Sequence, residues 1–192
     1  IQNNENYGLG GSHKVAFLYG METGADYVAI LHGDNQARTE ELGLLIAKAE
    51  SNQDISAVLG SRFMWKSNLS GYSYLRTIGN YALNLFYTLI TLRVTKDLGS
   101  GLNLFRLKAL HDKHFLGFSD RFTFNIDLLL DYYRKKSPIV FVPITWSETD
   151  QISNAKAFSV GSIALKTVLM WRFNKKKSPL ANKDYLFEYV WR

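Results

Sequence analysis

Three polar side chains follow one apolar stretch of the chain directly. Tyr27–Leu31 is apolar, and His32, Asp34 and Gln36 come after it at intervals of two residues. A short apolar run that ends at glycine beside an acid is typical of a buried strand, and alternate residues of an extended backbone share a side. An imidazole, a carboxylate and an amide oxygen on one side could hold a divalent cation. The alternative is a polar turn in which Asp34 and Asn35 bond their own backbone.

The composition is that of a folded protein with a basic balance. The 192 residues are 46% hydrophobic and 21% charged, which is ordinary for one well-packed domain and argues against disorder. The net charge of +6 favours anionic partners, such as phosphates, nucleotides or an acidic membrane surface. We recognise no nucleic-acid-binding module. Because the chain has no cysteine, disulfides and thiolate metal sites are excluded, and we expect a cytoplasmic location.

Strand-like and helix-like patterns alternate along the chain. Short apolar runs occur at 27–31, 56–60, 102–105 and 139–144, and helical patterns at 12–23, 39–50, 74–92, 124–136 and 159–173. This alternation predicts an α/β fold with a mostly parallel sheet flanked by helices. Near the start, Gly8, Gly10 and Gly11 predict a tight loop whose amides could approach a phosphate, without matching a known nucleotide-binding fingerprint.

Five short blocks, taken in order, resemble the family 2 glycosyltransferases, which have the Rossmann-like GT-A fold. The blocks are Asn6-Tyr7-Gly8, His32-Gly33-Asp34-Asn35-Gln36, Gly60-Ser61-Arg62, Asp97 through Arg106, and Val142-Pro143-Ile144. The resemblance runs from about Asn6 to Lys156. It implies that 1–158 is the C-terminal two thirds of a GT-A domain and 159–192 an amphipathic helix with a basic, aromatic tail. The strand and Asp-Asp turn that open such domains are missing, so we expect an incomplete N-terminus and poor donor binding by this chain alone.

The resemblance implies transfer of a sugar from a nucleotide-sugar donor, with Mg²⁺ or Mn²⁺ bridging the diphosphate. A divalent ion can neutralise the charge that develops on the leaving diphosphate. Asp34 is then the expected metal ligand, supported by Gln36. His32 stands where the family usually has its first Asp. Imidazole suits Mn²⁺ better than Mg²⁺, so His32 is either a ligand that favours Mn²⁺ or a residue that orients the donor.

The acceptor implied by the resemblance is a polyprenyl phosphate, as in the branch that includes the dolichyl-phosphate mannose synthases. Arg62 and Arg76 match the two arginines that hold the acceptor phosphate there, and Asn80 falls where a small polar residue assists. The planar guanidinium of an arginine can donate two parallel hydrogen bonds to the oxygens of a phosphate. Without the family pattern, Arg76 would be a solvated charge on a helix face. Lys156 resembles the lysine of a following loop that could meet phosphate.

A saccharide acceptor would instead need a general base. Asp97 is the first candidate, ahead of Glu148 and Asp150, although Asp97 could equally cap or brace its glycine-rich turn. Two further functions remain open: a sugar nucleotidyltransferase on the same scaffold, and a non-catalytic scaffold at a membrane surface. The helix at 159–173 and the Lys175–Lys177 run would support peripheral membrane contact. The cytoplasmic face of the membrane is therefore an alternative location, and the sequence leaves the oligomeric state open.

Overall fold

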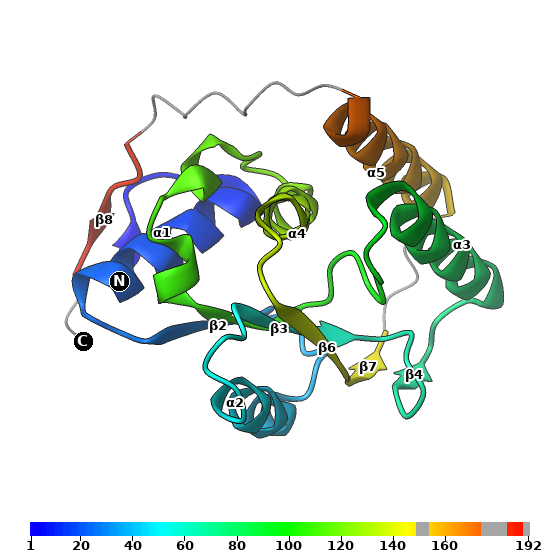
Figure 1. The fold of residues 1–192 in the computed structure, drawn as a ribbon, viewed down its shortest axis with the longest axis horizontal. Coiled ribbons are helices and arrows are strands. Elements are labelled where there is room, and N and C mark those ends of the chain that lie inside the picture. Colours follow the sequence, from blue (N-terminus) through cyan, green and yellow to red (C-terminus); the bar gives the residue numbers. More distant parts are fainter. Residues whose placement is uncertain (149–153, 174–183, 190–192) are drawn as a thin grey trace.

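A four-stranded sheet lies between helices in the structure of the chain, which is a computed structural model (Figure 1). The structure describes residues 1–148, 154–173 and 184–189, and for 154–158 it describes the backbone alone. The strands are β1 (Gln2–Asn3), β2 (Tyr27–Leu31), β3 (Ala57–Ser61), β4 (Asn68–Ser70), β5 (Leu102–Arg106), β6 (Ile139–Pro143), β7 (Thr145–Ser147) and β8 (Phe187–Glu188). The α-helices are α1 (Gly8–Glu22), α2 (Leu42–Glu50), α3 (Tyr74–Thr91), α4 (Phe124–Lys135) and α5 (Asn154–Phe173), and short 3-10 helices span Thr39–Glu41, Leu107–Leu110 and His114–Gly117.

The prediction of an α/β fold is confirmed, but the pairing within the sheet corrects the expectation of mostly parallel neighbours. The strand order is β2-β5-β3-β6, and β5 is antiparallel to both β2 and β3, whereas β3 and β6 are parallel. The reason is that α3 lies beyond one end of the sheet instead of crossing a face (Figure 1). The chain therefore returns to the sheet at the end where β3 left it, and β5 must run antiparallel to β3. β2, β3 and β6 still share one direction.

The sheet buries both of its faces, as the apolar strands predict. Side chains of β3 alternate: Ala57 and Leu59 join the larger core under α1 and α4, while Val58 joins the smaller core against α2. Figure 1 shows α2 on one side of the sheet and α1 and α4 on the opposite side. This alternation fixes the register of β3, because a slip by one residue would exchange the two faces. The positions of the strand ends are fixed with it.

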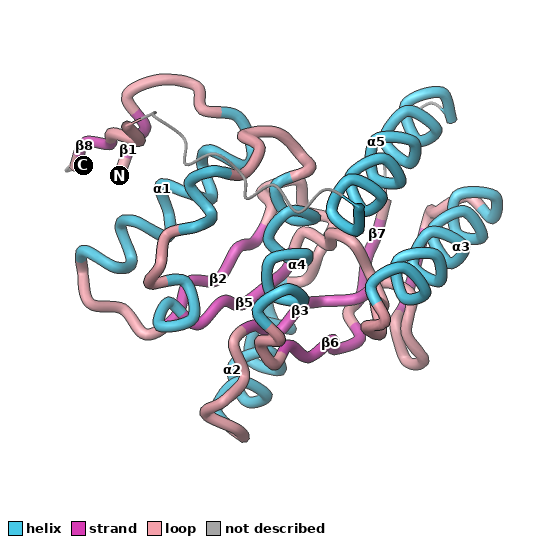
Figure 2. The backbone as a smooth tube through the Cα atoms, turned by 45° about the horizontal axis from the view of Figure 1, so that its top comes forward, coloured by secondary structure: helices cyan, strands magenta, loops and turns pink. Residues whose placement is uncertain are grey.

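Helices α3 and α5 lie side by side at one end of the molecule (Figures 1 and 2). The hydroxyl of Tyr87 on α3 donates to the carbonyl of Ala164 on α5, at 2.5 Å. Ala164 and Val168 also belong to the larger core, so α5 packs with the rest of the domain. The boundary predicted at residue 158 falls inside this helix. Within the described residues, none of the helices combines the length and apolar character that crossing a bilayer requires.

The segment around Gly8 and Gly10 packs against protein, which corrects the predicted phosphate-binding loop. Both glycines belong to α1, and the amides of Gly10 and Gly11 donate to the carbonyl of Asp120. A Cβ at Gly10 would overlap the carbonyl oxygen of Ser119. The glycines are therefore required by close packing of α1 on the segment before α4. Nearby, the fully buried Lys14 bonds Asp120 and Tyr185 and so ties the 184–189 segment to α1.

Candidate functional site

The predicted site residues gather where β2 and β3 end and β5 begins. The amide of His32 donates to the carbonyl of Gly101 at 2.9 Å, which joins the end of β2 to the turn before β5. A Cβ at Gly101 would lie 3.0 Å from the His32 ring and 2.9 Å from Trp146. Glycine is needed there because the backbone, an imidazole and an indole meet at one point. This edge of the sheet is where ligands bind in open α/β folds.

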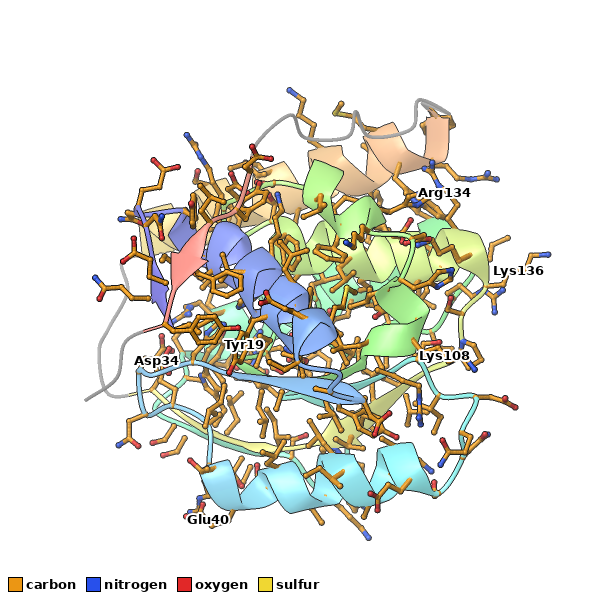
Figure 3. The ribbon with its side chains drawn as sticks, turned by 90° about the vertical axis from the view of Figure 1, so that its left-hand side faces the viewer. Tyr19, Asp34, Glu40, Lys108, Arg134 and Lys136 are labelled. Carbon is orange, nitrogen blue, oxygen red and sulfur yellow. The ribbon has the colours of Figure 1, made fainter. Side chains whose placement is uncertain are left out.

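Asp34 projects from the loop after β2 at the edge of the molecule (Figure 3). The residue is exposed, and its Oδ1 accepts a bond from the backbone amide of Gln36 at 3.2 Å. Asn35 takes a left-handed conformation with φ 58°. The polar turn foreseen as the alternative is thus present, yet the carboxylate remains open to solvent. Within the described part of the chain Asp34 makes no ion pair, so it is free to bind a cation.

His32 is half-buried and faces a second histidine that the sequence did not single out. The ring centroids of His13 and His32 lie 6.0 Å apart, and buried His13 Nδ1 and His32 Nε2 have no hydrogen-bond partner among the described residues. Burial is the main effect that lowers the pKa of His13 to about 4, and His32 adds to it. Asn125 acts on this pKa in the opposite direction, but its effect is smaller. Burial also lowers the pKa of His32; Asp34 opposes this and Arg62 adds to it. Both rings are therefore neutral at pH 7.

The donor set around Asp34 is small for a metal held by protein alone. No cluster of three or more His, Cys, Asp or Glu side chains that could hold a metal occurs in the described residues. The available donors are the exposed Asp34 carboxylate, the Gln36 amide and the His32 ring, whose Nε2 is buried. Such a set fits an ion that takes its remaining ligands from a diphosphate or water, as Mg²⁺ commonly does.

Arg62 and Asp97, predicted as an acceptor ligand and a possible base, form one ion pair. Arg62 Nε and Nη2 each reach a different carboxylate oxygen of Asp97 at 2.8 Å, and the amides of Arg62 and Gly99 donate to the same carboxylate. Burial alone would lower the pKa of Arg62, but Asp97, with Tyr72 and Glu148, raises it above its usual range. Of the two roles considered for Asp97, this geometry favours the brace of the turn.

Arg76 and Asn80 lie on one face of α3, as their spacing predicts, and both contact Tyr72. The Cζ atom of Arg76 lies 4.3 Å from the centroid of the Tyr72 ring, and that of Arg62 lies 6.0 Å from it. Asn80 Nδ2 donates to the Tyr72 hydroxyl at 3.3 Å. Arg76 is not a solvated charge, because its Nη1 donates to Glu148 Oε2 at 2.7 Å and its side chain is 15% exposed. Two guanidiniums therefore converge on one aromatic ring.

Two residues of this site, Tyr72 and His13, could not be singled out from the sequence. The side chain of a third, Lys156, lies outside the described residues. Tyr72 stood in a segment without periodicity, so nothing in the sequence distinguished it from its neighbours. His13 lies on the buried side of α1 among apolar residues, and its position opposite His32 follows only from the packing of α1 on β2. Lys156 is in α5, but its side chain is outside the described residues, as are Asp150 and the Lys175–Lys177 run.

Comparison with known proteins gives both a sequence match and a fold. No protein-family model matches the chain. The chain is 23% identical over 165 residues to the undecaprenyl-phosphate mannosyltransferase of Micrococcus luteus, an alignment that covers 85% of this chain and 67% of that protein.

Structures of glucosyl-3-phosphoglycerate synthase from Mycobacterium tuberculosis have the same fold. The complex with UDP matches with a TM-score of 0.61 at 14% identity, over 85% of this chain and 55% of that one. The complex with Mn²⁺, UDP-glucose and glycerol 3-phosphate matches with a TM-score of 0.59 at 13% identity, over 86% of this chain and 55% of that one. The chain thus spans about half the length of the solved proteins it matches. The chain therefore has the GT-A fold, and its sequence is similar to that of a glycosyltransferase, as the family 2 resemblance implied.

Proposed function

We propose that the protein transfers a sugar from a nucleotide-sugar donor to a polyprenyl-phosphate acceptor at a membrane surface, with Mg²⁺ or Mn²⁺ held at Asp34. The observation that carries the proposal is the convergence of Arg62 and Arg76 on Tyr72 at the rim of the sheet. Two buried guanidiniums beside an aromatic wall suit a phosphate headgroup followed by an apolar chain. The match to a mannosyltransferase that acts on undecaprenyl phosphate supports the same acceptor class.

The state of the carboxylates favours a phosphate over a saccharide acceptor. A sugar hydroxyl needs a general base, whereas a phosphate monoester is already anionic and needs none. Asp97 and Glu148, the two described candidates for that base, are each bound to an arginine. Each of these carboxylates is therefore already the partner of a guanidinium. The site is therefore better suited to positioning an anionic nucleophile than to deprotonating an alcohol.

The donor side of the proposal rests on the exposed carboxylate at the end of β2. Asp34 would bind the divalent ion with Gln36 as a weaker partner, and His32 would pack beneath the donor. The ion supplies neutralisation of the negative charge on the departing nucleoside diphosphate. A solved synthase that shares this fold is a complex with Mn²⁺ and UDP-glucose. Our assignment of Mg²⁺ or Mn²⁺ to this chain combines that likeness with the open position of Asp34.

An uncharged helix face supports the membrane location. The exposed residues of α3 recur at spacings of three and four and are apolar or aromatic: Tyr74, Leu75, Ile78, Tyr81, Leu85 and Leu89. Leu85 is 60% exposed and Leu89 63%. Helix α3 has no acidic residue, and its one charged side chain, Arg76, turns inward to Glu148. Such a stripe can enter the headgroup region of a bilayer, and it lies on the same helix as Arg76 and Asn80.

A competition between acceptors tests the proposal. The longest natural protein that contains this chain should be supplied with labelled nucleotide sugars, a divalent ion, and equal concentrations of a polyprenyl phosphate and a saccharide. We expect label in the lipid fraction and release of a nucleoside diphosphate. Label in the saccharide would overturn the acceptor assignment, and release of pyrophosphate would indicate a nucleotidyltransferase instead.

A further inference from the structure

The two arginines of the site are held in different ways. Arg62 presents two nitrogens to both oxygens of Asp97 and has a third contact to the carbonyl of Gly99. Arg76 makes one bond, from Nη1 to a single oxygen of Glu148, and its buried Nε has no partner within the described part of the chain. A paired two-bond contact is the stronger and more rigid of the two arrangements. Within the described residues, only part of the hydrogen-bonding capacity of the Arg76 guanidinium is therefore satisfied.

Glu148 occupies the position that an anionic ligand of Arg76 would take. Its side chain is only 3% exposed, and its partner is the guanidinium that also covers the Tyr72 ring. Burying a lone guanidinium is costly, so Arg76 needs an anion beside it whether or not a substrate is bound. A carboxylate contributed by the protein can meet this need until a ligand with more oxygens arrives.

The backbone of Glu148 is held by contacts that do not involve its carboxylate. The amide of Glu148 donates to the carbonyl of Ser70 at 2.9 Å, directly after β7 pairs with β4. Gly71, with φ 72°, lies so close that a Cβ there would overlap the carbonyl oxygen of Glu148. If the Glu148 side chain turns away from Arg76, these backbone contacts keep the strand that carries Trp146 in place.

We propose that Glu148 is an internal counter-ion that occupies the anion position beside Arg76 and is displaced by the phosphate group of the acceptor. This inference rests on the proposed function and names a specificity-determining residue of that site. A neutral sugar cannot replace a carboxylate on a buried guanidinium, whereas a phosphate monoester brings three oxygens and up to two charges. Glu148 thus selects for phosphate monoesters because every ligand must displace it from Arg76, which a neutral ligand cannot do.

The inference is tested by measuring how the chain binds a soluble prenyl monophosphate and inorganic phosphate, each by isothermal titration calorimetry. Glu148→Gln removes the competing charge but keeps nearly the same shape. We expect it to bind the prenyl monophosphate about tenfold more tightly than wild type, as loss of one charge-assisted competitor predicts. Glu40→Gln is the matched control, because it changes net charge equally at an exposed position on another part of the molecule. It should bind like wild type.

Variants of Arg76 distinguish a failure of the proposed role of Glu148 from a failure of the acceptor site itself. If the gain in Glu148→Gln disappears in the double variant with Arg76→Gln, the competition occurs at Arg76, as proposed. If wild type binds through Arg76 but Glu148→Gln binds no more tightly than Glu40→Gln, Glu148 is not a competing counter-ion, and the assignment of the acceptor site is unaffected. If Arg76→Gln leaves binding unchanged, or no variant binds, the acceptor site itself is wrong. Equal affinities of wild type for the two ligands would indicate a site for free phosphate and overturn the assignment to a lipid headgroup.

A second variant covers the case in which Glu148→Gln unfolds. Glu148→Asp retains the charge but is one methylene too short to keep the present contact with Arg76. We expect tighter binding than wild type, by less than in Glu148→Gln, and greater thermal stabilisation by added prenyl monophosphate. A Glu148→Asp protein whose affinity and ligand-induced stabilisation equal those of wild type would overturn the role of Glu148.

Discussion

Arg62 and Asp97 face each other in a two-bond ion pair, with both N···O distances at 2.8 Å, across the point where β3 leaves the sheet and β5 enters it. The pair spans 35 residues of sequence that include the whole of α3. It therefore joins the two ends of the segment that carries α3 and Arg76. The carboxylate of Asp97 also caps the amides of Arg62 and Gly99, so four donors meet one buried acid.

We expect Asp97→Asn to destabilise the protein by about 3 to 5 kcal/mol, the usual cost of leaving one member of a buried ion pair without its partner. Equilibrium unfolding in urea measures the change. Asp54→Asn, at an exposed position, should change stability by less than about 0.5 kcal/mol. If Asp97→Asn is as stable as Asp54→Asn yet abolishes transfer, Asp97 is a catalytic group and the brace is wrong.

Gly71 and Gly24 form a matched pair for the packing against Glu148. Both have φ 72°, but a Cβ at Gly71 would overlap Glu148 whereas a Cβ at Gly24 would meet nothing within 4 Å. Gly24→Ala should cost about 1 to 2 kcal/mol, the price of a left-handed backbone alone. Gly71→Ala should cost a further 1 to 3 kcal/mol from overpacking. Thermal unfolding of the two variants gives the difference, and equal losses would show that the close approach of Gly71 to Glu148 is absent.

Stability should fall as the pH drops from about 6.5 to 4. The pKa of His13 is lowered to about 4 in the folded protein, so in this window the unfolded chain binds a proton that the folded chain does not. The full effect of one such histidine is about 3 kcal/mol. Urea unfolding at pH 7, 5.5 and 4.5 should show a slope that His13→Gln reduces and that His111→Gln, at an exposed site, leaves in place. An equal slope in all three proteins would contradict the buried neutral state of His13.

The apolar stripe on α3 should bind anionic vesicles. Leu85→Glu removes one exposed leucine from the stripe and adds a charge that the bilayer disfavours, so we expect vesicle affinity to fall about tenfold or more. Leu44→Glu is the control, because Leu44 is 58% exposed on α2, away from α3 (Figure 1). Co-sedimentation with vesicles measures both. Equal losses in the two variants, or no loss in either, would remove the membrane role of α3.

The part of the site that depends on short stretches of chain could be predicted from the sequence. The apolar run ending at His32, Asp34 and Gln36 identified β2 and its polar exit, because a buried strand and the turn after it are local features. Arg76 and Asn80 were placed on one helix face by their spacing alone. Both predictions need no knowledge of distant contacts.

Long-range pairing could not be predicted in the same way. Nothing near Arg76 indicates that its partner is Glu148, 72 residues away, and nothing near Asp97 indicates Arg62. The direction of β5 depends on where α3 packs, which is set by its contacts with α5. Strand order and ion pairing are therefore properties of the assembled domain, and only family resemblance could suggest them in advance.

Metal-dependent transfer that uses Asp34 is tested most directly by a single measurement. The longest natural protein containing this chain should be assayed for transfer of labelled sugar to polyprenyl phosphate, with Mn²⁺ or Mg²⁺ and after chelation, beside its Asp34→Ala and Asp54→Ala variants. We expect wild type and Asp54→Ala to form labelled lipid only with a divalent ion, and Asp34→Ala to lose at least a hundredfold in rate, about 2.7 kcal/mol of transition-state stabilisation. Equal rates for Asp34→Ala and Asp54→Ala, or full activity after chelation, would contradict it.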